Sequence, residues 1–169
     1  MKAASVKAVL GALHAHDVRF LVAGGLAVNC YGYLRFTKDA DLVIELVPDN
    51  IRRTFDALES LGYKPNVPIS KDQFSDETTR LSWIKEKGMM VLQFWSDTHR
   101  QTPIDVFVSP PFDFAVEFAA ASPRDLPGAG PVPIVSLPTL IRMKENAGRP
   151  QDLIDIEQLR LASGDENNP

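Results

Sequence analysis

The feature that most constrains this chain is the segment 22–45, in which two apolar runs are separated by glycines, a basic turn and paired acids. The first run ends at Gly24 and Gly25, and the second begins at Asp39 and Asp41. A short apolar run followed directly by glycines predicts a buried strand that leads into a helix. The second run predicts another strand with acids where it begins. The segment therefore favours a sheet whose strands are connected by helices.

Apolar periodicity and turn residues extend this pattern along the chain. Helices are predicted at 2–15, 26–33, 51–61, from 70 or 72 to 87, and at 112–121, 137–146 and 150–161. Strands are predicted at 18–23, 39–47, 89–95, 103–109 and 132–135, with 63–70 extended and with loops at 96–102 and 122–131. The hairpin-like succession of 89–95 and 104–108 favours a mixed sheet. We expect an α/β (α+β) fold, a mixed β-sheet with flanking helices and a C-terminal helical pair, in one domain (1–163) with a disordered tail (164–169).

Composition excludes several classes of protein. The chain has 169 residues and a net charge of −4, which argues against a protein that coats nucleic acid but leaves room for a local basic groove. Cys30 is the only cysteine, so neither an intrachain disulfide nor a cysteine-based metal site is expected. No apolar run approaches the ~20 residues that span a bilayer, and the N-terminus lacks a secretion signal. We expect a cytoplasmic protein without a membrane segment.

Gly24 and Gly25 allow two interpretations. Glycines between a strand and a helix N-terminus present unobstructed backbone N–H groups, and the helix dipole favours an anion there. This arrangement suits the phosphates of a nucleotide, although a tight structural turn is the commoner reason for such a pair. The patterns G-x-x-x-x-G-K and G-x-G-x-x-G are both absent, so the pair is neither a Walker A loop nor a dinucleotide-binding fingerprint.

Asp39 and Asp41 are two positions apart, so on a strand their side chains point to the same face, ~7 Å apart. Buried carboxylates repel each other, and a divalent cation compensates; oxygen ligands select Mg²⁺ or Mn²⁺. The alternative is a solvated strand end, with Asp39 paired to Arg35 or Lys38. Asp105 would complete a cluster if it shares this face, where it would also take a proton from an attacking hydroxyl. Its alternative is a strand-end residue that caps a turn.

Cationic side chains gather near the turn between the last two predicted helices, at Arg142, Lys144 and Arg149. A cation aimed at a triphosphate would neutralise the charge that develops on pyrophosphate. The alternative is an ion pair between Lys144 and Asp152 that contributes little to stability. Arg35 is a second basic candidate for binding a nucleotide.

These motifs in combination resemble a known signature. Gly24-Gly25, thirteen intervening residues, Asp39-Ala40-Asp41-Leu42 and the later Asp105 are similar to the pattern of the nucleotidyltransferase superfamily, which has the DNA polymerase β-like fold. More narrowly, R-F-T-K-D-A-D-L and L-I-R-M-K-E-N-A-G-R-P-Q-D-L-I-D-I-E-Q-L resemble the AbiEii-type nucleotidyltransferases of bacterial toxin–antitoxin systems and their small relatives. The resemblance covers about half of the chain: the segment 18–46, the strand of Asp105 and the last two helices.

The resemblance implies a role for each of these residues. Asp39 and Asp41 would bind catalytic Mg²⁺ ions, and Asp105 would complete the metal-binding and catalytic set. The residues that would bind or support the nucleotide are Gly24 and Gly25 at its phosphates, Lys144 near its triphosphate, and Arg149 with Asp152 in the following R-x-x-D element. The Ser often found at the second glycine position is absent, which removes one hydroxyl contact to phosphate.

We therefore expect a metal-dependent nucleotidyltransferase that moves an NMP from an NTP to an acceptor hydroxyl on a tRNA end, a protein or a small molecule. A cognate antitoxin is an expected partner if the chain belongs to a toxin–antitoxin system. Little of the chain remains outside the core to bind a large acceptor, so a homodimer or a partner subunit would complete the site. The alternative is a non-catalytic module of the same fold that binds a nucleotide or a partner protein.

Overall fold

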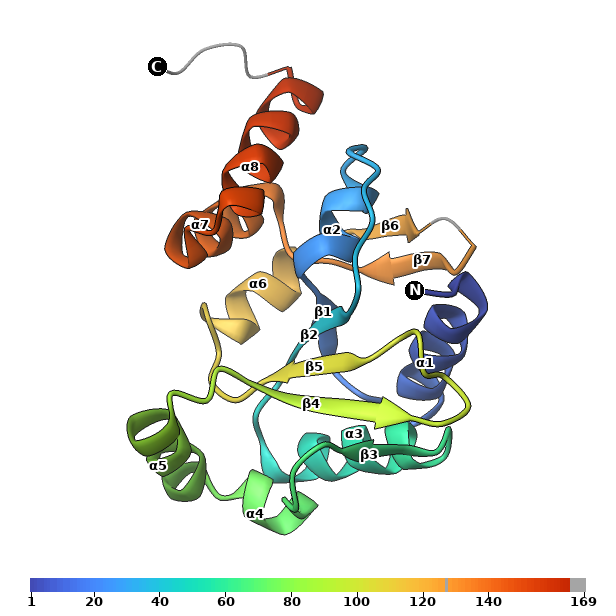
Figure 1. Ribbon diagram of the computed structural model, residues 1–169, viewed down its shortest axis with the longest axis vertical. Coiled ribbons are helices and arrows are strands. Elements are labelled where there is room, and N and C mark those ends of the chain that lie inside the picture. Colours follow the sequence, from blue (N-terminus) through green and yellow to red (C-terminus); the bar gives the residue numbers. More distant parts are fainter. Residues whose placement is uncertain (127, 165–169) are drawn as a thin grey trace.

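The computed structural model describes residues 1–126 and 128–164. The helices in these residues are α1 (Ala3–Ala15), α2 (Gly24–Cys30), α3 (Pro48–Glu59), α4 (Lys71–Ser75), α5 (Glu77–Lys87), α6 (Phe114–Ala120), α7 (Leu137–Ala147) and α8 (Pro150–Ala162). The strands are β1 (Phe20–Val22), β2 (Ala40–Ile44), β3 (Tyr63–Pro65), β4 (Val91–Ser96), β5 (Ile104–Phe107), β6 (Pro123–Leu126) and β7 (Gly130–Pro133) (Figure 1). None of the described helices is long and apolar enough to cross a membrane. The predicted tail, 164–169, lies outside the described residues apart from Gly164.

Five strands form one mixed sheet in the order β1-β2-β5-β4-β3. β2 and β5 are parallel, whereas every other neighbouring pair is antiparallel. The prediction of a mixed sheet is therefore confirmed. β6 and β7 form a separate antiparallel pair. The backbone N–H of Val135 donates to the carbonyl of Val22 at 3.1 Å, which joins the chain just after β7 to β1.

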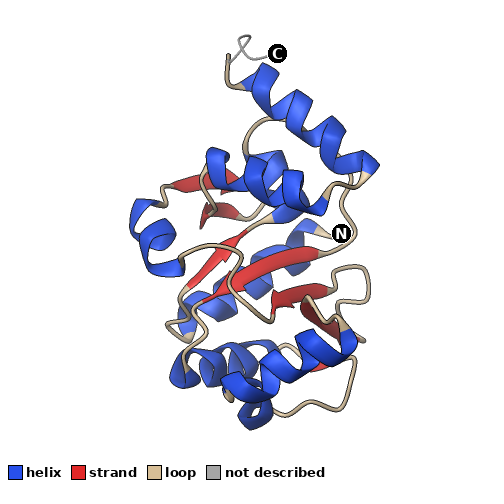
Figure 2. Ribbon diagram, turned by 90° about the vertical axis from the view of Figure 1, so that its left-hand side faces the viewer, coloured by secondary structure: helices blue, strands red, loops and turns tan. Residues whose placement is uncertain are grey.

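One face of the large sheet forms the main core with α1 and α3 (Figure 2 shows strands lying between groups of helices). Side chains along a strand alternate between the two faces, so every second residue points into this core. On the three central strands these buried residues are Ala40, Leu42, Ile44, Leu92, Phe94, Ile104 and Val106. Phe55 of α3 packs edge-on against Phe94, with ring centroids 5.0 Å apart. Burying one such ring stabilises the fold by about 1.5–3 kcal/mol.

The opposite face of the sheet is covered at one end only. Leu21 of β1 and Val43 of β2 belong to a second apolar cluster with residues of α2, α6, α7 and α8. The same face of β4 and β5 carries side chains that are only half-buried: Val91, Gln93, Asp105 and Phe107. The helices therefore leave this end of the face open, and a predicted site residue, Asp105, lies there.

Two predicted helices begin earlier than expected. The helix predicted at 26–33 begins at Gly24 and ends at Cys30, so both glycines lie in its first turn and not in a loop before it. Gly24 has a φ of 58°, a left-handed value that glycine adopts at little cost. The helix predicted at 51–61 begins at Pro48, where the missing N–H of proline costs no hydrogen bond.

Two other predictions were wrong about continuity. The helix predicted to run to residue 87 is divided into α4 and α5 at Asp76, whose carboxylate accepts from the backbone N–H of Thr79 at 2.8 Å and so caps α5. The segment 122–131, predicted to be a loop, contains β6 and the start of β7, whereas the strand predicted at 132–135 contains only the end of β7. β6 and β7 are both edge strands of a two-stranded sheet, and edge strands tolerate proline.

Candidate active site

A row of polar side chains crosses the open face of the sheet. In the parallel pairing of β2 with β5, Asp41 lies opposite Asp105. In the antiparallel pairing of β4 with β5, Gln93 lies opposite Asp105, and its Nε2 donates to Oδ1 of Asp105 at 2.9 Å. Directly opposed residues of neighbouring strands point to the same face. The strand register therefore places the two carboxylates side by side, as predicted, and adds Gln93, which the sequence did not identify.

The pKa values of the two strand carboxylates are raised. Burial raises the pKa of Asp41 to about 7, with further contributions from the negative charges of Asp39 and Asp105, and with Arg149 and Lys144 opposing them. Burial also raises the pKa of Asp105, although the hydrogen bond from Gln93 lowers it and the charge of Asp39 raises it further. Asp39 precedes β2 by one residue and acts electrostatically on both carboxylates. The acids thus form one interacting group of like charges.

The two glycines of α2 allow close packing beside these acids. A Cβ atom at Gly24 would overlap the carboxylate of Asp41, and a Cβ atom at Gly25 would overlap the side chain of Thr37. The backbone N–H of Ala23 donates to the carbonyl oxygen of Asp41 at 2.9 Å. The start of α2 therefore lies directly against Asp41, and the absence of a side chain at Gly24 makes this close approach possible.

The late helices contribute a buried network of alternating charges. Lys144 of α7 donates from Nζ to Asp152 at 3.0 Å and to Asp155 at 2.5 Å, and all three side chains are buried. Arg149, in the turn between α7 and α8, donates from Nε to Asp152 at 2.7 Å. Arg35 donates from Nη2 to Asp155 at 2.9 Å from the opposite side. The structure therefore shows the ion pair between Lys144 and Asp152 that was the alternative to a nucleotide contact, and it adds Asp155 as a second acid.

Sequence reasoning missed Asp155, although a signal was present. Asp155 follows Asp152 by three positions on α8, and side chains at this spacing lie on the same side of a helix. Its pattern D-L-I-D places two acids on a surface that α7 covers. Such a pair requires cations, and Lys144, the nearest lysine in the preceding helix, supplies one.

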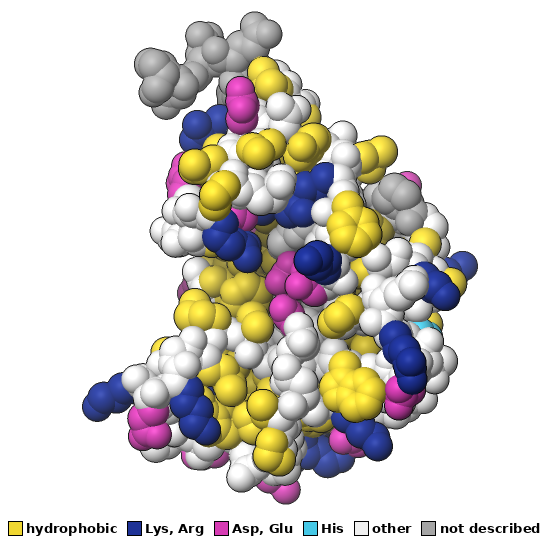
Figure 3. Space-filling model, viewed as in Figure 1, with side chains coloured by type: hydrophobic (Ala, Val, Ile, Leu, Met, Phe, Trp, Pro, Cys, Tyr) yellow, Lys and Arg dark blue, Asp and Glu magenta, His cyan; other side chains and the backbone are white. Residues whose placement is uncertain are grey.

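A cavity of about 560 Å³ brings most of the predicted site residues together. The predicted residues that line it are Gly24, Asp41, Asp105, Lys144, Arg149 and Asp152. Asp39, Gly25 and Arg35 do not line it, and Arg35 instead holds Asp155 from outside. Figure 3 shows acidic side chains in a hollow on this face, with Lys or Arg and hydrophobic side chains around them. The segments 22–45 and 144–152 thus meet in one cavity.

The oxygen donors fit a magnesium ion that is bound together with phosphates. Within residues 1–126 and 128–164, no group of three or more His, Cys, Asp or Glu side chains is arranged to hold a metal ion by itself. Mg²⁺ is commonly bound by one or two carboxylates, with substrate phosphates and water completing its coordination. Asp41 and Asp105 form such a pair, and the negative charge of Asp39 adds to the repulsion that a divalent ion would compensate.

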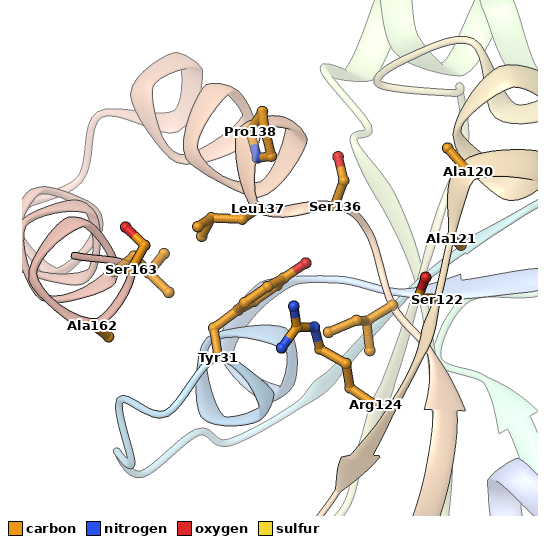
Figure 4. Close-up of a pocket in the computed structure, with 12 residues that line it drawn as sticks. Tyr31, Ala120, Ala121, Ser122, Arg124, Ser136, Leu137, Pro138, Ala162 and Ser163 are labelled. Carbon is orange, nitrogen blue, oxygen red and sulfur yellow. The ribbon is translucent and has the colours of Figure 1, made fainter. Parts of the chain in front are cut away.

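A separate pocket of about 440 Å³ contains none of the predicted site residues. It is lined by Tyr31, by Arg124 of β6 and by residues of α7 and the end of α8 (Figure 4). The Arg124 guanidinium lies 4.3 Å from the centre of the Tyr31 ring, which is within the range of a cation–π interaction. Among residues 1–126 and 128–164, the side chains that line this pocket include no carboxylate, so we assign the candidate active site to the larger cavity.

Comparison with known proteins identifies the fold. No family model matches the chain, and no curated protein matches it. The lincosamide antibiotic adenylyltransferase LnuA, solved with lincomycin bound, superposes with a TM-score of 0.64 at 13% identity, over 95% of this chain and 97% of that chain. ANT(2")-Ia in complex with adenylyl-2"-tobramycin gives 0.62 at 15% identity, over 97% and 90%. The chain has the fold of these nucleotidyltransferases.

A third solved structure extends the comparison beyond these two proteins. It is an antigenic nucleotidyltransferase-like protein from Paracoccidioides brasiliensis, which superposes with a TM-score of 0.57 at 17% identity, over 93% of this chain and 74% of that chain. The fold predicted from the glycines, the acids and the late helices is therefore confirmed. At these identities the superpositions establish the fold and leave the activity to be argued from the site.

Proposed function

We propose that the chain is a metal-dependent nucleotidyltransferase that moves an NMP from an NTP to an acceptor hydroxyl. The observation that carries this proposal is the register of β2 and β5, which places Asp41 beside Asp105 in a cavity that also contains Gly24 and Arg149. Phosphoryl transfer requires acids that hold a divalent ion, backbone that a phosphate can approach, and a cation. The fold shared with nucleotidyltransferases supports the same conclusion.

In the proposed reaction, the acceptor hydroxyl transfers its proton to Asp105 and its oxygen attacks the α-phosphorus of the NTP. A new P–O bond forms, the bond to the β-phosphate oxygen breaks, and pyrophosphate leaves. Gln93 holds one oxygen of Asp105 at 2.9 Å, which orients the carboxylate. A divalent ion would be held by Asp41 and Asp105, with Asp39 beside them, and would neutralise charge on the phosphates.

Arg149 is the cation most available to a triphosphate. Its side chain is 73% exposed, whereas that of Lys144 is 5% exposed and is held between two carboxylates. We propose that Arg149 contacts the triphosphate directly. Lys144 would then act mainly by holding Asp152 and Asp155 in place, and Asp152 in turn orients Arg149 through its Nε.

The proposed acceptor is the hydroxyl of a small molecule. LnuA was solved with lincomycin and ANT(2")-Ia with adenylyl-2"-tobramycin, so we propose a small-molecule hydroxyl as the acceptor. The competing acceptors are a tRNA end and a protein hydroxyl. The AbiEii-type resemblance implies a toxin–antitoxin role as the biological context. A non-catalytic module would bind NTP in the same cavity without transferring an NMP.

The test is label transfer from each α-labelled NTP with Mg²⁺ and three acceptor sets: hydroxyl-bearing small molecules, total tRNA and the protein itself. We expect Asp41→Asn and Asp105→Asn to lower transfer by at least about 100-fold, because each removes a charge that acts in the transition state. Asp97→Asn, at an exposed ion pair, is the control. Transfer that survives Asp41→Asn would refute the assignment, and NTP binding without transfer to any set would favour the non-catalytic alternative.

A further inference from the structure

The cavity that contains the acids has an apolar lobe, for which the proposed chemistry provides no role. We define the apolar lobe by its lining residues Met90, Val91, Phe107, Pro111, Leu140 and Met143. They come from β4 and the residue before it, from β5 and the loop after it, and from α7. Met90 is 64% exposed, and Met143 and Phe107 are only half-buried. These flexible or aromatic side chains are therefore available to a ligand.

The apolar lobe lies beside Asp105 on the sheet. Phe107 follows Asp105 by two positions on β5, so both side chains point to the open face. Val91 of β4 lies opposite Phe107 in the antiparallel register. The cation Arg149 is placed instead by the turn between α7 and α8. A group bound in the apolar lobe is therefore adjacent to the carboxylate that takes the proton of the acceptor.

The charges of the cavity argue against a highly charged acceptor. The carboxylates that line it are Asp41, Asp105 and Asp152. Asp152 accepts hydrogen bonds from Lys144 and Arg149, and the proposed reaction uses the other two. Among the described residues of the lining, no acid is left to hold a polycation, and the six side chains of the apolar lobe carry no charge. A volume of about 560 Å³ suits a small molecule.

We propose that the apolar lobe binds the acceptor, which is a small, uncharged molecule that carries its reacting hydroxyl next to an apolar or aromatic group. The proposal rests on the proposed function, because it takes Asp105 as the residue that receives the hydroxyl proton. It goes beyond that function in naming the chemical class of the acceptor. It also separates this chain from enzymes whose acceptors are polycationic sugars or RNA.

The methionine methyl groups allow a direct test. The chain has four methionines; Met90 and Met143 line the apolar lobe, whereas Met1 and Met89 pack against the main core. In protein labelled with ¹³C at the methionine methyls, we would titrate phenyl β-glucoside, methyl β-glucoside, a polycationic aminoglycoside and tRNA. Burial of a phenyl ring predicts that the phenyl glucoside binds at least about tenfold more tightly than the methyl glucoside. Its shifts are expected at Met90 and Met143 and not at Met1 or Met89.

Three results would overturn the proposal. The first is equal binding of the two glucosides. The second is tighter binding of the aminoglycoside or tRNA at the Met90 and Met143 methyls. The third is displacement of the phenyl glucoside by a non-hydrolysable NTP with Mg²⁺, together with shifts of the Met90 and Met143 methyl signals by the NTP. That result would assign the apolar lobe to the nucleobase.

A variant separates this proposal from the proposed function. Met143→Gln places an uncharged polar side chain of similar length in the apolar lobe, and we expect it to abolish the preference for the phenyl glucoside while calorimetry with the non-hydrolysable NTP and Mg²⁺ stays unchanged. Leu81→Gln, at an exposed position of α5, is the matched control for the introduced amide. If the unmodified protein does not bind the NTP, the nucleotidyltransferase assignment is refuted, whereas the glucoside result still stands. A preference that survives Met143→Gln would refute the apolar lobe as the binding site.

Discussion

At the scale of single residues, the site depends on how closely backbone and carboxylate approach each other. Gly24 combines a left-handed φ with a position where a Cβ atom would overlap the Asp41 carboxylate. Asp41 in turn lies opposite Asp105, so a displaced Asp41 would change the distance between the two acids. The requirement for glycine is therefore both conformational and steric, and it links α2 to the acids of the sheet.

Gly24→Ala is expected to destabilise the protein by roughly 1–3 kcal/mol, because the left-handed backbone conformation is unfavourable for alanine and the Cβ atom displaces Asp41. Urea unfolding monitored by circular dichroism measures this change. Gly11→Ala is the control: Gly11 lies inside α1, a Cβ atom there would contact nothing within 4 Å, and alanine stabilises a helix interior by about 0.5–1 kcal/mol. Opposite signs for the two substitutions are expected, and equal effects would contradict the close approach.

At the scale of elements, α6 and α7 are joined by one carboxylate. Glu117 of α6 accepts from the backbone N–H of Ser136 at 2.5 Å and from the hydroxyl of Thr139 at 2.8 Å, at the N-terminus of α7. Burial raises the pKa of Glu117, but these hydrogen bonds, together with the charge of Arg142, lower it by more, so the net shift is downward. A carboxylate from one helix therefore satisfies the first turn of another, and α7 carries Lys144 toward the site.

Glu117→Gln is expected to destabilise the protein by roughly 1–3 kcal/mol at neutral pH, because hydrogen bonds to a charged acceptor are lost. The folded-state pKa lies below the unfolded value, so this stabilisation is present above about pH 4.5 and is lost as pH falls through the folded pKa. Unfolding free energies at pH 7 and below pH 4 measure it. The difference from the unmodified protein is expected to shrink at low pH, and Glu157→Gln on the exposed side of α8 should change neither value.

The elements themselves were predictable where one physical signal was strong. The glycines and the apolar runs of β1 and β2 predicted the first strand–helix–strand segment, with α2 displaced by two residues because glycine is usually a helix boundary. The pair β6 and β7 was missed because its prolines and glycines indicate a loop, and pairing between the two strands outweighed that preference. The helix predicted to run to residue 87 is divided at Asp76, because the Asp76 side chain caps the N-terminus of α5 and so competes with a continuous helix.

At the scale of the whole molecule, Asp155 holds distant segments together. Its carboxylate is fully buried and binds Arg35 from the segment before β2, Lys144 from α7 and Gln151 from α8. Burial raises the pKa of Asp155, but the hydrogen bonds from Lys144 and Gln151 and the neighbouring cations lower it by more. This contact fixes the late helices against the half of the chain that carries the acids.

Asp155→Asn is expected to destabilise the protein by about 3–5 kcal/mol, because it leaves the buried Lys144 ammonium and Arg35 without their shared charge. Thermal and denaturant unfolding measure the loss. Asp97→Asn is the control, since its pair with Arg100 is exposed on both sides and such pairs contribute about 0–1 kcal/mol. An effect of Asp155→Asn no larger than that of Asp97→Asn would show that the late helices are held in place by other contacts.

The sequence by itself determined the kinds of groups in the site and the strands and helices that carry them, because apolar periodicity, glycine and acid spacing act locally. It predicted that Asp105 clusters with Asp41 only on the condition that both lie on one face of the sheet, and the parallel register of β2 with β5 places them on one face. Only the tertiary structure decided that Arg35 binds Asp155 outside the cavity and that Lys144 lies between two acids. It also decided that Gln93 and the apolar lobe border Asp105. These contacts join residues that are distant in sequence. Many Asp, Glu, Lys and Arg side chains could form such pairs, and only the folded structure determines which of them come within hydrogen-bond distance.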